Sequence, residues 1–201
     1  MKRLIYGVGI NDSYHKTEWI DDLGKRAICP YYRKWKNMLC RVYSKSYLKR
    51  NPTYKDATIE KEWHTFTNFK RWMITQDWED KELDKDILFP NNNHYSPNTC
   101  CFVSRKLNGL LVSTSKIRGL YPIGVDYEKR RKHFRATIKI NGKQKYLGSF
   151  QSANDAHVAY IVAKIAYIKT FYSGVNNRIK EGLERHCAAL TFTLMDRLYI
   201  S

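Results

Sequence analysis

Acidic side chains gather in a ten-residue stretch of a chain that is otherwise strongly basic. The formal net charge is +17 at pH 7. Even so, six carboxylates precede an asparagine-rich loop: Asp77, Glu79, Asp80, Glu82, Asp84 and Asp86. Carboxylate and amide oxygens suit Mg²⁺, which proteins hold with one or two carboxylates and the phosphates of a substrate. The stretch is therefore a candidate magnesium site, and a solvated loop that offsets the charge of Lys81 and Lys85 is the alternative.

Two side chains of this stretch bear on phosphodiester hydrolysis, which needs a proton acceptor beside the metal. His94 lies in the asparagine-rich loop, and the pKa of a histidine is close to neutrality, where a general base works best. Lys85 is protonated at that pH, and the neighbouring carboxylates of Asp84 and Asp86 favour its charged form. Among these two candidate catalytic residues, His94 suits a base and Lys85 suits a phosphate contact. An exposed loop histidine without a chemical role is the alternative for His94.

The residues from 83 to 108 follow a distinctive order. They run Leu83-Asp84-Lys85-Asp86-Ile87, then Asn91 to Asn93, then Tyr95-Ser96-Pro97-Asn98-Thr99-Cys100, and finally Asn108. This order resembles the variant HNH-type module of small phage endonucleases, in which a strand, a loop, a second strand and a helix surround one metal ion. By position, the resemblance implies that Asp84 and Asn108 are the ligands of the metal, Mg²⁺ or another divalent cation. The general-base histidine of active HNH enzymes falls on Lys85, and the loop asparagine that braces the turn falls on Thr99.

Aromatic residues at helical spacing precede this module and are expected to support it. After Pro30, apolar positions recur every three or four residues, which predicts a helix over 28–43. A short strand over 57–59 and a second helix over 61–75, rich in tryptophan and phenylalanine, follow. We expect these aromatic side chains to form a core rather than a platform on which bases stack.

The second half of the chain predicts three antiparallel strands and a helix. Strands are expected over 121–127, 133–140 and 144–150, and the Asn141-Gly142 pair between the last two is a strong hairpin signal. Ser152 begins a capping-box-like sequence that opens a helix to about residue 172. Alternation along the middle strand directs Ala136 and Ile138 to this helix.

Positive charge is concentrated on this predicted sheet. From Lys129 to Lys145 there are eight basic residues and no acid. Such a one-sided charge favours nucleic acid, whose phosphates it neutralises, over a solvated face, which usually mixes both signs. The candidate DNA contacts are Lys129, Arg130, Arg131, Lys132, Arg135, Thr137, Lys139, Lys143, Gln144, Lys145 and Tyr146.

A second resemblance covers residues 119 to 171. The matching residues are Gly124-Val125, Phe134-x-Ala136-x-Ile138, Asn141-Gly142-Lys143, Tyr146-Leu147-Gly148-Ser149-Phe150, Asp155-Ala156 and Ala159-Tyr160. They resemble the AP2 DNA-binding domain, in which a three-stranded sheet enters the major groove. The resemblance implies that Thr137, Lys139, Gln144 and Tyr146 face double-stranded DNA, with the basic residues 129–132 on its backbone. Where plant members carry arginines on the first strand, this chain has Asp126 and Glu128.

Length and composition predict an α+β protein of small domains. We expect an HNH-like domain over 1–117, an AP2-like domain over 118–174 and a helical tail over 175–201. The five cysteines have no regular spacing, so neither a disulfide framework nor a paired zinc site is predicted. No apolar run has the length of a signal peptide or a membrane span, so a cytoplasmic protein without a membrane partner is expected.

Together, the two resemblances match the layout of phage-encoded HNH/AP2 proteins, which are often homing-type endonucleases. The predicted function is double-stranded DNA binding with metal-dependent cleavage in the host cell. The alternative is a catalytically inactive regulator or inhibitor that engages DNA or a host protein. Lys85 and Thr99 favour the binder, whereas Asp84 and Asn108 favour the enzyme. No motif points specifically to a host protein partner.

Overall fold

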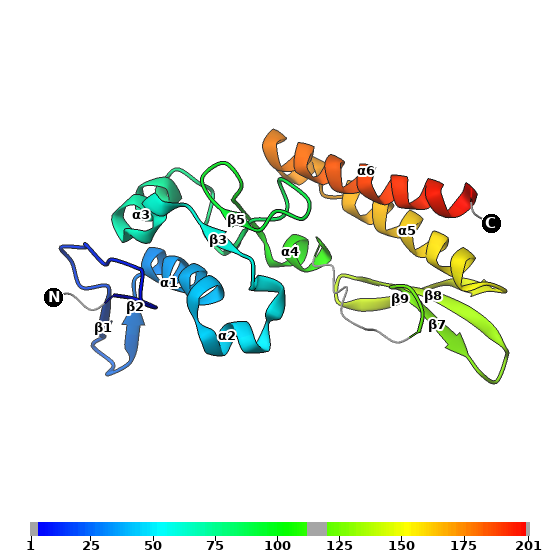
Figure 1. The fold of residues 1–201 in the computed structure, drawn as a ribbon, viewed down its shortest axis with the longest axis horizontal. Helices are drawn as coiled ribbons and strands as arrows, with labels where there is room; N and C mark the ends of the chain where they lie inside the picture. Colours follow the sequence, from blue (N-terminus) through cyan, green and yellow to red (C-terminus); the bar gives the residue numbers. More distant parts are fainter. Residues whose placement is uncertain (1–3, 112–119, 200–201) are drawn as a thin grey trace. The chain divides into compact units, whose positions relative to one another are not determined.

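The computed structural model describes residues 4–111 and 120–199 of the chain. It divides into two compact units, Met1–Ser104 and Arg105–Ser201 (Figure 1). Each unit combines helices with small sheets, which confirms the predicted α+β class. The expected domain boundary between residues 117 and 118 lies outside the described residues.

The first unit contains three two-stranded sheets and three α-helices. In chain order the elements are β1 (Glu18–Ile20), β2 (Arg26–Ile28), α1 (Pro30–Tyr43), α2 (Lys45–Arg50), η1 (Pro52–Tyr54), β3 (Thr58–Ile59), η2 (Lys61–His64), α3 (Phe66–Ile74), β4 (Lys81–Asp84), β5 (His94–Tyr95) and β6 (Cys101–Ser104). The pairs β1–β2 and β4–β6 are antiparallel, whereas β3 and β5 are parallel. The pairing of β4 with β6 closes the long loop that carries the candidate chemistry.

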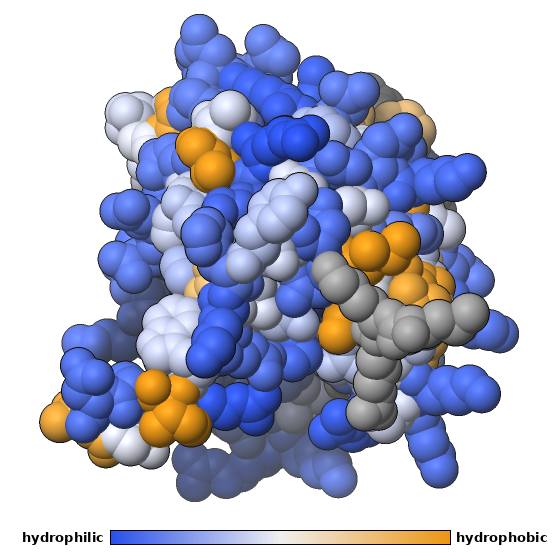
Figure 2. All heavy atoms as spheres, turned by 90° about the vertical axis from the view of Figure 1, so that its left-hand side faces the viewer, coloured by the Kyte–Doolittle hydropathy of each residue, from blue (hydrophilic) through white to orange (hydrophobic). Residues whose placement is uncertain are grey.

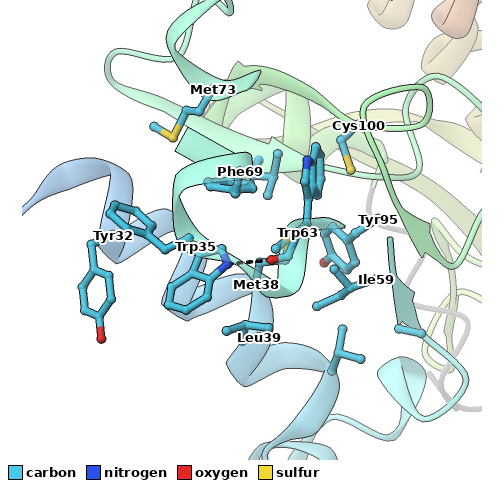
Figure 3. Packing of buried hydrophobic residues seen from close by; sticks show 14 of the residues in the cluster. Tyr32, Trp35, Met38, Leu39, Ile59, Trp63, Phe69, Met73, Tyr95 and Cys100 are labelled. Atoms are coloured by element: carbon cyan, nitrogen blue, oxygen red, sulfur yellow. Dashed lines mark hydrogen bonds between the residues drawn. The ribbon is translucent and has the colours of Figure 1, made fainter. Parts of the chain in front are cut away.

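Helix α1 supplies one wall of the core of the first unit. Pro30 stands in its first turn, where the missing N–H costs nothing. Its buried positions are those that the sequence pattern predicts: Tyr32, Trp35, Met38, Leu39 and Val42. The indole Nε1 of Trp35 donates to the carbonyl of Trp63 over 2.7 Å, so the polar atom of this fully buried ring is satisfied (Figure 3).

The predicted helix over 61–75 is divided in the structure. A 3₁₀ turn, η2, comes first, Thr65 has extended backbone, and α3 follows. The reason is a contact far away in sequence: Ile10 N–H donates to the His64 carbonyl, and Phe66 N–H donates to the Ile10 carbonyl, both within 3.0 Å. The segment at Ile10 therefore pairs with the backbone on both sides of Thr65, and η2 ends there.

The second unit begins with α4 (Arg105–Leu111) and contains the predicted sheet. Strands β7 (Val125–Glu128), β8 (His133–Ile140) and β9 (Lys143–Phe150) form an antiparallel sheet in the order β7-β8-β9. Asn141 and Gly142, with φ of 52° and 79°, form the predicted tight hairpin turn.

Helix α5 (Ala153–Lys169) packs on the sheet, and α6 (Asn177–Tyr199) packs on α5. The Ser152 side chain accepts a hydrogen bond from the Asp155 N–H, which confirms the predicted cap of α5. Ile138 of the sheet clusters with Tyr160 and Ile161 of the helix. Gly124, with φ of 83°, lies so close that an added Cβ would stand 2.1 Å from the Tyr160 ring. One face of the sheet is thus sealed by α5.

The surface of the first unit carries both hydrophilic and hydrophobic side chains. The side of the first unit shown in Figure 2 is mostly hydrophilic, and its hydrophobic side chains form small separate groups. Trp19, Ile20 and Leu23 are exposed on and beside the β1–β2 hairpin. None of the helices in the described ranges combines the length and apolar character needed to cross a bilayer.

Candidate functional site

Strand register defines the residues on the uncovered face of the β7–β8–β9 sheet. Thr137 pairs with Tyr146, and Lys139 pairs with Gln144. Ala136 and Ile138 alternate with Thr137 and are buried toward α5, so these two pairs point the other way. Gln144 Nε2 donates to Thr137 Oγ1 over 3.1 Å, and the Tyr146 side chain is 61% exposed. The four residues form one polar, accessible surface.

The turn between β7 and β8 carries a dense group of exposed cations. Its members are Lys129, Arg130, Arg131 and Lys132, all of which are exposed. Lys132 has a φ of 51°, which turns the chain tightly at the start of β8. Within the described part of the chain, none of the four forms an ion pair. Four positive charges are therefore presented to solvent at one end of the sheet.

The expectation of a one-sided basic face is wrong at the β7 end. Asp126 pairs with Arg135 across the strands, so both point to the uncovered face, and Glu128 follows two residues on. Arg135 Nε donates to Asp126 Oδ2 over 2.8 Å, and Arg135 Nη1 donates to Glu128 Oε2 over 3.1 Å. The bond to Asp126 raises the pKa of Arg135. Arg135 is held between two carboxylates, and the face carries both signs there.

Two other candidate DNA contacts lie on the side of the sheet that α5 covers. Lys143 pairs with Ile140, and Lys145 pairs with the buried Ile138. Cross-strand partners share a face, so these lysines point away from Gln144 and Tyr146 although both are exposed. These two candidate contacts therefore do not belong to the uncovered face.

In the first unit, Asp84 ends β4 and starts the loop. Its Oδ1 accepts hydrogen bonds from the backbone N–H groups of Asp86 and Ile87, each over 2.7 Å. Burial raises the pKa of Asp84 above its ordinary value, and the nearby Asp86 acts in the same direction, against the two backbone bonds. A carboxylate that is costly to ionise and held rigidly at a strand end is the kind of group that a cation would stabilise.

Lys85 is engaged by the loop itself. Its Nζ forms an ion pair with Asp86 and donates to the Asn92 carbonyl over 2.7 Å. It also lies 5.8 Å from the ring centre of Tyr54 and 6.0 Å from that of Tyr95. Because only 11% of the side chain is exposed, the amine serves the loop as a cationic brace. These contacts give no support to a role as general base.

His94 faces β3 and the residue that follows it. Its Nδ1 is 2.8 Å from Thr58 Oγ1, and its Nε2 is 3.7 Å from Glu60 Oε2. Both nitrogens are directed to these neighbours because β5 pairs in parallel with β3. To accept a proton from water beside a metal, the ring would have to leave Thr58.

Asn92 is a bracing residue that the sequence analysis did not single out. Its Nδ2 donates to the carbonyls of Lys85 and His94, over 2.7 and 2.8 Å. Thr99 helps, because its Oγ1 donates to the same His94 carbonyl over 2.6 Å and accepts from Ser96 N–H. The turn that the resemblance expects residue 99 to brace is thus braced by two side chains, the hydroxyl of Thr99 and the amide of Asn92. The local sequence signal for this role of Asn92 was its place as an asparagine inside a Pro-bounded loop.

The proposed metal ligands come from different units, Asp84 from the first and Asn108, on α4, from the second. Asn108 is half-buried. Within residues 4–111 and 120–199, no group of three or more His, Cys, Asp or Glu side chains is arranged to hold a metal. Burial raises the pKa of Cys100 to about 12, so this thiol stays protonated and is a structural residue.

Comparisons with known proteins add no family to this description. No protein-family model matches the chain, and searches of curated proteins and of solved structures give no match either.

Proposed function

We propose that this protein binds double-stranded DNA through the uncovered face of the β7–β8–β9 sheet and the basic turn at residues 129–132, in the cytoplasm of a phage-infected host. One observation carries the proposal. Four exposed cations adjoin a surface on which Thr137, Lys139, Gln144 and Tyr146 lie together. The likeness to the AP2 domain in the sequence supports the same surface.

The two parts of this surface suit different parts of a duplex. Lysine and arginine in the turn neutralise backbone phosphates and release counterions, which supplies affinity without sequence preference. Side chains on the strands offer hydrogen-bond donors and acceptors, and the major groove is about 12 Å wide, enough for a two-stranded ribbon. Gln144 can pair with adenine, and Lys139 can donate to guanine.

Binding to a pool of randomised duplexes, followed by anisotropy over a range of salt concentrations, tests the proposal. Lys129→Gln with Lys132→Gln should lower the slope of log affinity against log salt by roughly 2, about 0.9 for each lost phosphate contact. The matched control is Lys143→Gln with Lys145→Gln, which removes the same charge from the other side of the sheet. Equal losses in both variants would show that only net charge matters, and the proposed surface would then be wrong.

A second candidate function is metal-dependent hydrolysis of the bound DNA. It is favoured by the order β4, loop, β6, α4, which is the strand, loop, strand and helix order of the HNH-like resemblance, and by the raised pKa of the half-buried Asp84. The resemblance assigns Asp84 and Asn108 to Mg²⁺, which polarises a scissile phosphate and activates water. Lys85 braces the loop, so the proton acceptor would be His94 after its ring leaves Thr58.

Incubation of supercoiled plasmid with the protein in Mg²⁺, Mn²⁺ or EDTA tests this candidate. Cleavage that needs a divalent ion, and that disappears in Asp84→Asn and Asn108→Ala, is the expected result. Salt-sensitive binding without cleavage of any substrate would instead identify an inactive binder, such as a regulator or an inhibitor that also engages a host protein.

A further inference from the structure

Arg41 connects α1 to the strand that carries Asp84. It lies in the last turn of α1, and its Nη1 donates to the Leu83 carbonyl of β4 over 3.3 Å. The side chain is half-buried, although it carries a full charge. A guanidinium group is therefore held beside the residue that precedes Asp84.

Three tyrosines surround this guanidinium group. The rings of Tyr47 and Tyr54 lie 5.7 Å apart and nearly perpendicular, and Tyr95 is buried in the core (Figure 3). Burial acts to lower the pKa of Arg41, but Tyr95 and Tyr54 outweigh it, so the pKa is raised and the group is charged at every relevant pH. Burial also raises the pKa of Tyr95 and Tyr47. The phenols are thus neutral hydroxyl groups at neutral pH.

A second cation shares two of these rings. Lys85 Nζ lies 5.8 Å from the Tyr54 ring centre and 6.0 Å from the Tyr95 ring centre. Lys85 is balanced by Asp86. Arg41 has no carboxylate partner among the residues that the structure describes. The charge of Arg41 is therefore not neutralised by an ion pair in this part of the structure.

A charged group taken out of water is costly unless a counterion and hydrogen bonds compensate it. The guanidinium fork has five N–H donors, and the contacts to the Leu83 carbonyl, Tyr95 and Tyr47 do not use them all. Arg41 is only partly buried, so part of its side chain is open to solvent and to a ligand.

We propose that Arg41, Tyr54 and Tyr47 form a binding site for a phosphate-type oxyanion, with Lys85 adding positive charge beside the Tyr54 ring. The fork of a guanidinium group matches two oxygens of one phosphate, and phenol hydroxyls donate to a third. The oxyanion has two sources, a backbone phosphodiester of DNA or free phosphate. The DNA source rests on the proposed function, whereas the phosphate source does not.

Calorimetric titration of the full chain with sodium phosphate, against sodium chloride at equal ionic strength, measures the site without DNA. Arg41→Gln should weaken phosphate binding on the order of ten- to a hundredfold, the usual effect of losing charge-assisted hydrogen bonds. Arg50→Gln is the matched control, because Arg50 is exposed on α2 and bonds only to its own helix. Equal phosphate binding by wild type and Arg41→Gln, or no binding by wild type, would overturn the proposal.

A purely structural role of Arg41 predicts a different pattern. In that case Arg41→Gln lowers the melting temperature by the same amount in phosphate and in chloride, and the proposal fails. Tyr54→Phe keeps the ring against Tyr47 and Lys85 but removes the hydroxyl, so it should fold normally and still weaken phosphate binding severalfold. Retention of full phosphate affinity by Tyr54→Phe would remove this hydroxyl from the site and overturn the proposal as stated.

The source of the oxyanion is decided with duplex DNA. If the backbone supplies it, Arg41→Gln lowers the salt slope of DNA binding by about 0.9, and Arg50→Gln does not. An unchanged slope, together with lost phosphate binding, identifies free phosphate as the ligand and keeps the site. Absence of DNA binding by the wild type would refute the proposed function but leave the phosphate titration as an independent test.

Discussion

The basic side chains of the β4–β6 loop region and those of the β7–β8–β9 sheet differ in what surrounds them. In the first unit, Lys85 is bound by a carbonyl, a carboxylate and two rings, and Arg41 donates to the carbonyl of Leu83. In the second unit, residues 129–132 and Lys139 are exposed. Identical residue types therefore have different roles. The cations of the first unit bind other groups of the protein, whereas those of the second unit are exposed to solvent.

Arg135 shows that position on the sheet alone does not make a cation available. It lies on the same uncovered face as Lys139, but Asp126 and Glu128 hold it. The charge of the face therefore changes along β8: Arg135 is ion-paired near the beginning of the strand, whereas Lys139 near the Asn141-Gly142 turn has no ion-pair partner among the described residues. The ion-pair partners and the burial of a cationic side chain, rather than the net charge of the protein, decide whether it can bind a polyanion.

The largest effect is expected where the sheet meets α5. Gly124→Ala places a Cβ about 2 Å from the Tyr160 ring on a backbone with φ of 83°, so it should destabilise the second unit by roughly 3 kcal/mol or more. Gly142→Ala is the control, because its φ is also positive but nothing lies within 4 Å of the added atom; it should cost about 1 kcal/mol. Hydrogen exchange should show reduced protection of backbone amides in the β7–β8–β9 sheet and unchanged protection in α1. Equal destabilisation by the two variants would contradict the packing described for Tyr160.

The comparison between the two groups of cations is tested most directly by one substitution in each. Lys85→Met keeps the aliphatic packing but leaves the Asn92 carbonyl and Asp86 without the amine, so it should lower stability by about 1 to 3 kcal/mol. Lys139→Met should change stability by less than about 0.5 kcal/mol, because this side chain is exposed. Denaturant titration measures both.

DNA binding should show the reverse order. Lys139→Met should weaken affinity severalfold and reduce its salt dependence by about one counterion. Lys85→Met, measured at a temperature where it remains folded, should change the salt dependence little. A destabilised Lys139→Met protein, or a Lys85→Met protein as stable as wild type, would contradict the assignment of a structural role to Lys85 and of a DNA-binding role to Lys139.

Local signals in the sequence were sufficient for some elements of the fold. Pro30 and the helical spacing after it predicted α1 to within two residues of its start. Asn141-Gly142 predicted the β8–β9 hairpin, since this pair suits a turn with two positive φ angles. In each case the information lies within a few residues of the feature.

Features that depend on contacts between distant residues were not predicted. The division of the 61–75 helix comes from Ile10, more than fifty residues earlier. The surroundings of Arg41 depend on how α1 packs against β4. Asp126 and Glu128 were visible in the sequence, yet only the register with β8 shows that they neutralise Arg135.

Asp84 provides a prediction of intermediate size. Because burial raises its pKa above the ordinary value of 3.8, the folded state binds a proton more tightly than the unfolded state. The stability that this gives is fully present below the unfolded pKa and is lost as pH rises through the folded pKa. Asp84→Asn keeps an acceptor for the two backbone N–H groups and removes the charge. It should therefore be more stable than wild type at neutral pH, by on the order of 1 kcal/mol.

Thermal denaturation from acid to neutral pH measures this difference, which should grow as Asp84 ionises and then stay constant. Asp84→Ala is the control, because it loses the charge and the acceptor together and should be destabilised. If Asp84 holds a divalent cation, Mg²⁺ should raise the melting temperature of wild type but not of Asp84→Asn. A stability difference that does not vary with pH would contradict the raised pKa.

The smallest expected effect concerns the acidic end of the sheet face. Asp126→Asn removes a carboxylate that repels DNA phosphates. The substitution also weakens the bond that holds Arg135. DNA affinity should therefore rise about two- to fivefold, the size of a surface ion-pair effect. Glu184→Gln, an exposed change of the same charge on α6, should raise affinity less. The uncovered face would then be the side that meets DNA, because a repulsive charge matters most where phosphates approach. Unchanged affinity in Asp126→Asn would mean that DNA does not approach this end of the face, and that the contact is confined to the half of the sheet near Lys139 and Gln144.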